Sequence, residues 1–162
     1  WGCGFSSRRI TVSTVGLPPQ LERLARDTPV NLAVSLVATN NEVRNRLMPV
    51  NRRYPIEKLI SVCRTLPIPQ GRRITFEYVM LAGVNDTPGD AERLIRLLRG
   101  IPSKVNLIPF NPFPGAGFES STPEAIRVFQ ERLQEGGVNA TVRTSRGRDV
   151  QAACGQLAAA AA

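Results

Sequence analysis

Apolar and polar residues alternate along five stretches of the chain, and segments of helical periodicity lie between them. The alternating stretches are residues 8–15, 30–37, 72–81, 104–110 and 138–143. Alternation with a period of two is typical of a strand that buries one face. Between the strands, apolar residues recur three and four positions apart, which predicts helices. We place these helices at 18–27, 41–48, 55–66, 87–100 and 121–137.

Repeated strand–helix units predict a parallel sheet. An antiparallel sheet with one wet face would show the same alternation, but the intervening helices argue against it. One face of each strand is apolar and must carry the helices, whereas the other face is small and polar. Strands of a doubly wound sheet are apolar on both faces, and a closed barrel fills its interior with bulky branched residues. The pattern therefore favours an α/β fold whose repeated βα units form part of a (βα) barrel with a polar interior.

Functional residues of βα barrels lie at the carboxyl ends of the strands and in the loops that follow. Ser13 and Ser35 end the first two strands on the polar face, where each could bind a ligand or cap the next helix. Asn111 opens the loop NPFPGAG, which its prolines stiffen. This residue could face a ligand or bond its own backbone in a plain turn.

Positive charge dominates the composition, with 21 Lys and Arg against 13 Asp and Glu and a net charge of +8. A basic balance favours a polyanionic partner such as nucleic acid, although a solvated Arg-rich surface has the same composition. Arg143, Arg146 and Arg148 follow the last strand and are expected at the barrel mouth, where they could meet phosphate. The pairs at 8–9 and 72–73 precede strands, so we expect them at the opposite end as solvated charge.

The residue types present also exclude several chemistries. The chain has no His, which excludes Ser-His-Asp and Cys-His catalysis and His-ligated zinc. Its cysteines stand at 3, 63 and 154, and an odd number without a secretory signal argues for a reducing, cytoplasmic location. No apolar run reaches the roughly 18 residues that cross a membrane, so we expect no membrane association.

Two of the cysteines have readable surroundings. Cys63 falls within an apolar helical pattern and is expected in the core. Cys154 lies among small residues beside several arginines, and nearby positive charge favours the reactive thiolate. A small buried thiol is the alternative for Cys154.

Six segments together resemble the RlmN/Cfr family of radical S-adenosylmethionine (SAM) enzymes. They are RRITVSTVGL, VNLAVSL, PVNRRYPIE, ITFEYVMLAGVND, VNLIPFNPFPGAGF and RGRDVQAACGQL. The match runs over residues 8–157, and NPFPGA together with AACGQL is highly specific. The resemblance implies a radical-SAM-type partial (βα) barrel, with residues 1–157 as the C-terminal portion of that domain and 158–162 as an Ala-rich tail.

The resemblance also implies a chemistry, methylation of C2 of adenine in 23S ribosomal RNA and transfer RNA. Cys154 would be the catalytic residue, because one SAM molecule methylates its sulfur in the family scheme. A second SAM, cleaved at a 4Fe–4S cluster, would give the 5′-deoxyadenosyl radical that takes hydrogen from this methyl group. The carbon radical would then add to adenine C2.

Further roles follow from the resemblance. It implies SAM contacts from Ser13, Ser35, Leu36, Val37 and Asn111. Where the family has His, this chain has Val37, so that contact could be kept only through the backbone. Ribosomal and transfer RNA are the implied partners, with a reductant such as flavodoxin or ferredoxin for the full enzyme.

The chain departs from the family in what it lacks. The CxxxCxxC cluster motif, the N-terminal RNA-binding domain and the second catalytic cysteine, all upstream in the family, are absent. We therefore expect an internal start, no metal ligands in this chain and no activity from the chain alone. One alternative is a non-catalytic RNA-binding α/β module that kept the scaffold. A phosphate-binding barrel enzyme is a third, disfavoured because no Gly-rich phosphate loop or acid–base pair stands out.

Overall fold

Five parallel strands lie side by side, in the order in which they occur along the chain, in the computed structural model of the protein, which describes residues 6–113 and 115–143. The strands are β1 (Thr11–Thr14), β2 (Asn31–Ser35), β3 (Ile74–Met80), β4 (Ser103–Pro109) and β5 (Asn139–Val142). The helices are α1 (Pro18–Asp27), α2 (Asn41–Leu47), α3 (Ile56–Thr65), α4 (Pro88–Leu98) and α5 (Pro123–Glu135). Short 3₁₀ helices, η1 (Ser7–Arg9) and η2 (Pro49–Arg52), precede β1 and follow α2.

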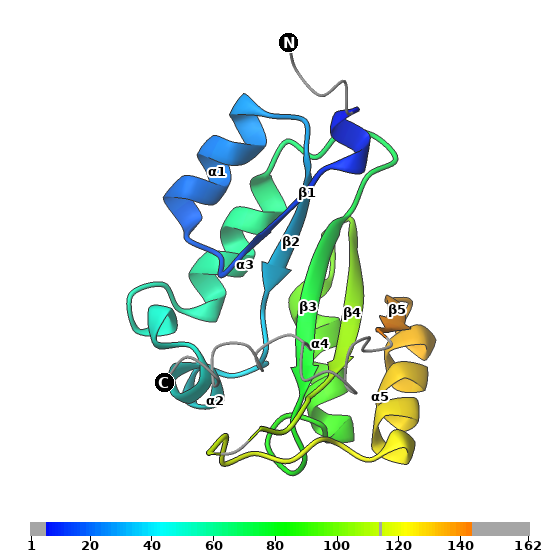
Figure 1. Cartoon of the computed structure of the whole chain (residues 1–162). Coiled ribbons are helices and arrows are strands. Elements are labelled where there is room, and N and C mark those ends of the chain that lie inside the picture. The colour runs from blue at the N-terminus through cyan, green and yellow to red at the C-terminus, as the bar shows by residue number, and fades with distance from the viewer. Residues whose placement is uncertain (1–5, 114, 144–162) are drawn as a thin grey trace.

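The strand order confirms the predicted arc of a βα barrel. Each crossover moves the chain to the next strand in sequence, and every neighbouring pair is parallel. A doubly wound sheet would reverse its order at a switch point. Right-handed crossovers that always advance in one direction put the helices on one face, as Figure 1 shows. The antiparallel alternative is wrong.

The first predicted strand begins later than its sequence pattern indicates. Residues 8–10 were expected to open it, but Ser7–Arg9 forms η1. The Ser6 carbonyl accepts from the Arg9 amide at 2.8 Å, and the Ser6 hydroxyl accepts from the Arg8 amide at 3.4 Å. These local bonds compete with strand pairing because a serine side chain can satisfy a nearby amide.

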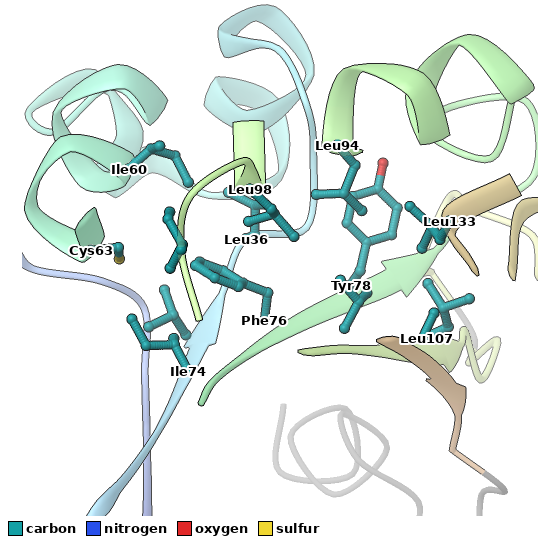
Figure 2. Packing of buried hydrophobic residues seen from close by; sticks show 14 of the residues in the cluster. Leu36, Ile60, Cys63, Ile74, Phe76, Tyr78, Leu94, Leu98, Leu107 and Leu133 are labelled. Carbon is teal, nitrogen blue, oxygen red and sulfur yellow. The ribbon is translucent and has the colours of Figure 1, made fainter. Parts of the chain in front are cut away.

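The helix-covered face of the sheet, here called the outer face, carries the core. On β3, Ile74, Phe76, Tyr78 and Met80 point to this face and are fully buried. Figure 2 shows Phe76 beside Leu98 of α4, and Tyr78 between Leu94 of α4 and Leu133 of α5. Burying each large apolar side chain contributes roughly 1.5–3 kcal/mol, so this cluster stabilises the packing of the helices on the sheet.

Helix α5 is fixed at its start and against the sheet. The Thr122 hydroxyl accepts from the Ala125 amide at 3.1 Å and Pro123 occupies the first turn, as the sequence predicts. On the buried side, the rings of Phe129 and Tyr78 stack with centroids 5.4 Å apart. Stacked aromatic pairs add to the gain from burial alone.

The opposite face of the sheet, the inner face, is mostly polar. Its polar residues are Thr11, Ser13, Asn31, Ser35, Thr75, Glu77, Lys104, Asn106, Asn139 and Thr141, and its apolar ones are Ala33, Val79 and Ile108. No helix among the described residues is long and apolar enough to cross a lipid bilayer.

Replacing Phe129 should test the aromatic contact between α5 and β3. Phe129→Ala is expected to lower the free energy of unfolding by about 3–5 kcal/mol, because it removes a buried ring and leaves a cavity beside Tyr78. Val128→Ala on the same helix is the control, since Val128 is 36% exposed. Urea unfolding gives both values, and similar losses for the two variants would contradict the packing described.

Candidate functional site at the carboxyl edge of the sheet

The carboxyl half of the inner face brings together side chains from neighbouring strands. Ser35 pairs with Glu77, Glu77 with Asn106 and Asn106 with Thr141, so the four form one row across the sheet. The Ser13 hydroxyl reaches this row and donates to Glu77 Oε2 at 2.8 Å. Adjacent strands are about 4.8 Å apart, so a ligand lying across the row can contact several of these groups.

Ser13 and Ser35 lie where the sequence predicts, on the polar face near the strand ends. The helix-capping alternative is wrong for both. Helix α1 follows Leu17, which makes no side-chain cap, and α2 is capped by Asn40, whose Oδ1 accepts from the Val43 amide at 2.8 Å. Ser13 instead bonds Glu77.

Glu77 was not among the site residues that the sequence indicated. Its carboxylate is the only acidic group on the described inner face. It accepts one hydrogen bond from Ser13 and has lone pairs for further donors, such as ligand hydroxyl or ammonium groups. The available signal was an acid at a polar position of a strand, which the pattern alone does not separate from an ordinary solvated residue.

Val37 follows β2 in an unusual backbone conformation. Its φ is +63°, the only positive φ at a described residue other than glycine. The Ala38 amide donates to the Leu36 carbonyl at 2.8 Å, which closes a three-residue turn around Val37. Such turns with positive φ are rare and strained, above all for a β-branched residue. The strain lies at the carboxyl end of β2, beside the row of polar groups.

Of the two residues after Ser35 that the resemblance assigns to SAM, Leu36 has only its backbone available for a ligand, whereas Val37 is not confined in this way. The Leu36 side chain is fully buried in the core (Figure 2). The amides of both residues donate to the Glu77 carbonyl, at 3.0 and 3.3 Å. The Val37 carbonyl accepts from Asn85 Nδ2 at 2.7 Å and retains a second lone pair.

Asn85 holds two strand ends together, and the sequence analysis did not identify it. Its side chain is fully buried. Nδ2 donates to the carbonyls of Val37 and Val79, both at 2.7 Å, and Oδ1 accepts from the Leu81 amide at 2.8 Å. Asn85 therefore fixes the end of β2 relative to the end of β3.

Arg44 does the same for β1 and β2. Its side chain is completely buried, and Nε donates to the Leu36 carbonyl at 3.0 Å. Nη2 donates to the carbonyls of Val15 and Ser35 at 3.1 and 3.2 Å, and Nη1 donates to Asn51 Oδ1 at 2.8 Å. Burial lowers the pKa of Arg44 to about 10, so the guanidinium stays charged at neutral pH. An arginine within a short helix gives no sequence signal of this role.

Asn111 follows β4 and is buried, with 7% of its surface exposed. Phe110 precedes it, and the rings of Phe113 and Phe118 in the loop after it have centroids 6.1 and 6.5 Å from that of Phe110. The Arg46 guanidinium carbon of α2 lies 5.6 Å from the Phe118 ring centroid. The loop thus crosses from β4 toward α2, as Figure 1 shows.

Of the three cysteines, the structure describes only Cys63. Cys63 is 1% exposed, and burial raises the pKa of its thiol to about 12, which confirms the core assignment. Cys3, Cys154, Arg146 and Arg148 lie outside the described residues. Arg143 is described at the end of β5, where its amide donates to the Leu107 carbonyl at 2.8 Å.

The described residues fit one implied cofactor and not the other. Between residues 6 and 143, leaving out 114, no group of three or more His, Cys, Asp and Glu could hold a metal ion. A 4Fe–4S cluster needs thiolates, whereas the described Cys63 is buried in the core. SAM carries hydroxyl, ammonium and carboxylate groups, which suit the polar row at the carboxyl edge.

Solved structures share this architecture. A radical SAM methyltransferase from Sphaerobacter thermophilus superposes with a TM-score of 0.91 at 54% identity, over 96% of this chain and 46% of that chain. A domain of a pyruvate-formate lyase-activating enzyme from Bacteroides vulgatus has a TM-score of 0.64 at 15% identity, which shows the fold alone. The chain therefore has the partial-barrel fold of radical SAM enzymes.

Curated relatives match nearly the whole chain. Dual-specificity RNA methyltransferases RlmN from Anaeromyxobacter dehalogenans and Syntrophobacter fumaroxidans are 59% and 56% identical, each over 158 residues and 98% of this chain. No protein-family model matches the chain. Over nearly its whole length the chain is thus similar to RlmN RNA methyltransferases, and it spans 42% and 46% of the length of these two relatives.

Relieving the backbone strain at Val37 should stabilise the protein. Val37→Gly is expected to raise the free energy of unfolding by about 1 kcal/mol, because positive φ costs a β-branched residue roughly 1–3 kcal/mol and glycine nothing. Val79→Gly is the control, since Val79 is half-buried in extended backbone, and it should destabilise. Urea unfolding that shows equal losses for both variants would refute the strain.

Arg44 should be far more sensitive to substitution than its neighbour on α2. Arg44→Met is expected to cost at least about 3 kcal/mol of unfolding free energy, because several buried acceptors lose their donor. Arg46→Met removes an exposed cation from the same helix and should cost less than about 1 kcal/mol. Equal costs for the two variants in thermal or urea unfolding would contradict the role of Arg44 in holding the ends of β1 and β2 together.

Proposed function

We propose that this chain is the SAM-binding and methyl-carrying part of an RNA methyltransferase that modifies C2 of adenine in ribosomal and transfer RNA. The observation that carries the proposal is 54% identity to a radical SAM methyltransferase of the same fold, together with a polar row at the carboxyl edge. The names of the relatives supply RNA as the substrate class. The net charge of +8 suits a polyanionic substrate.

The cofactor would lie across the carboxyl edge. Ser13, Ser35 and Glu77 offer hydroxyl and carboxylate groups there, Asn111 opens the loop after β4, and Val37 offers a backbone carbonyl. Arg44 and Asn85 hold these strand ends at fixed spacing, so the site is formed before a ligand binds. SAM supplies an activated methyl group when bound.

Cys154 would carry the methyl group. Adenine C2 has no acidic proton and is electron-poor, so direct polar transfer of a methyl cation is poorly suited to it. A one-carbon unit held on a cysteine thioether could be delivered as a carbon radical once a hydrogen atom is taken from its methyl group. SAM, cleaved with an electron at a cluster that other parts of the complete protein would hold, would supply the radical that takes this hydrogen. Cys63 cannot take this role, because its thiol is buried in the core and its pKa is raised to about 12.

The cluster that starts radical chemistry requires ligands that this chain does not supply. Its cysteines at positions 3, 63 and 154 do not have the spacing of the family motif. We infer that the chain alone is inactive, and that the complete protein acts in the cytoplasm with a small electron-transfer protein as reductant.

Replacing each cysteine in the complete protein tests the methyl-carrier role. Cys154→Ala should abolish adenine-C2 methylation while RNA affinity stays within about twofold, because the change removes a thiol and no positive charge. Cys63→Ala is the matched control and should keep methylation at a level set by its stability. Methylation is read by mass spectrometry of digested RNA.

The outcomes separate the proposal from its alternative. A non-catalytic RNA-binding module would bind RNA but show no methylation before any substitution. Methylation that survives Cys154→Ala would refute the assignment of this thiol while leaving the activity itself established.

A further inference from the structure

The amino end of the inner face holds a basic cavity that the proposed function does not use. It has a volume of about 570 Å³. Three cations line it, Arg72, Arg73 and Lys104, together with the neutral polar side chains of Thr11, Asn31 and Thr75. No acidic residue lines the cavity. Its lining residues stand at or near the starts of β1 to β4, the end of each strand opposite its arrowhead in Figure 1.

Strand register builds this cavity from residues far apart in the sequence. Thr11 of β1 pairs with Asn31 of β2, and Thr75 of β3 pairs with Lys104 of β4. Arg73 stands two positions before Thr75, so both extend toward the inner face. Polar and cationic groups from the starts of the four strands β1 to β4 therefore lie around one hollow.

The cations differ in their partners. Arg72 Nη1 donates to the Pro29 carbonyl, which ties the turn before β3 to the start of β2. Arg73 and Lys104 have no hydrogen-bond or ion-pair partner among the described residues. Glu77, the acid on the inner face, bonds Ser13 instead and stands four positions after Arg73. Positive charge is thus concentrated at the amino end and left uncompensated.

The lining of the cavity combines charge with neutral donors and acceptors. Arg73 and Lys104 are exposed, which agrees with the solvated charge that the sequence predicts at 72–73, and with Arg72 they share one concavity with three neutral polar side chains. Arginine matches the oxygens of phosphate with a planar fork of donors, and lysine adds a compact charge. Hydroxyl and amide groups bind the remaining oxygens.

We propose that Arg73 and Lys104, with the polar side chains around them, bind a phosphate group at the amino end of the sheet. The carrier of this group is either inorganic phosphate or the backbone of the RNA substrate. Only the second carrier rests on the proposed function. Lys104 stands two positions before Asn106 and Arg73 four positions before Glu77, so the two cations lie roughly 7 and 13 Å along the strands from the polar row. The two sites use different side chains, so phosphate binding can be tested apart from methyl transfer.

A pair of charge-matched double variants tests the site. Arg73→Gln/Lys104→Gln removes the two unpartnered cations, and Arg26→Gln/Arg96→Gln removes two exposed cations from α1 and α4. Isothermal titration with inorganic phosphate and fluorescence anisotropy with a short labelled single-stranded RNA are run on the purified protein. Unfolding by urea checks that both variants remain folded.

The expected result is a loss confined to the cavity variant. Its affinity for at least one probe should fall about tenfold or more, since each lost bond to a charged group is costly. If RNA is the carrier, its salt dependence should weaken by roughly 1.4 in slope, about 0.7 for each phosphate contact. Loss of phosphate binding with RNA binding unchanged would identify free phosphate as the ligand.

Equal losses for both double variants, or no loss for either probe, would overturn the site. Cys154→Ala gives the independent arm, because it should abolish methylation and leave phosphate binding intact. Failure of the methylation proposal would therefore not remove the phosphate site, and failure of the phosphate site would not remove the methylation proposal.

Discussion

The buried guanidinium of Arg44 is the constraint on which the carboxyl edge depends. Parallel strands are linked laterally by their own hydrogen bonds, but these stop where the strands end. Beyond that point Arg44 bonds the carbonyls that leave β1 and β2, and Asn85 bonds those that leave β2 and β3. A charged group without a carboxylate partner is costly to bury, so its full set of acceptors is what makes this arrangement stable. Because these bonds hold the strand ends, the side chains of the polar row also keep their spacing.

The two faces of the sheet divide the work of the protein. The outer face packs Phe76, Tyr78 and their neighbours under the helices and supplies the stability. The inner face contributes little to the core and carries polar groups along its length. Its charge is also divided, because Arg73 and Lys104 lie at the amino end and Glu77 lies toward the carboxyl end. A sheet with this polarity can hold a cofactor at one end and a phosphate group at the other.

Much of the fold could be predicted from residue patterns because its causes are local. Alternation in β3 separated buried Phe76 from Glu77, and Thr122 with Pro123 marked the start of α5. The predicted start of β1 was wrong. The Ser6 side chain and carbonyl form local hydrogen bonds, and the alternation of apolar and polar residues gives no sign of them. Ser13 and Ser35 could be placed at the strand ends from the sequence. Only the structure shows that neither caps a helix, because Leu17 and Asn40 occupy the capping positions of α1 and α2.

The sequence by itself determined the order of βα units, the polar inner face, the core position of Cys63 and the resemblance to the RlmN family. These depend on period, composition and motif, which the chain carries without folding. Only the tertiary structure decided that Glu77 meets Ser13, that Arg44 and Asn85 join the strand ends, that Val37 adopts positive φ, and that Arg73 and Lys104 share a cavity. These features depend on how strands and helices from separate parts of the chain pack together. A residue pattern along one segment carries no information on such contacts.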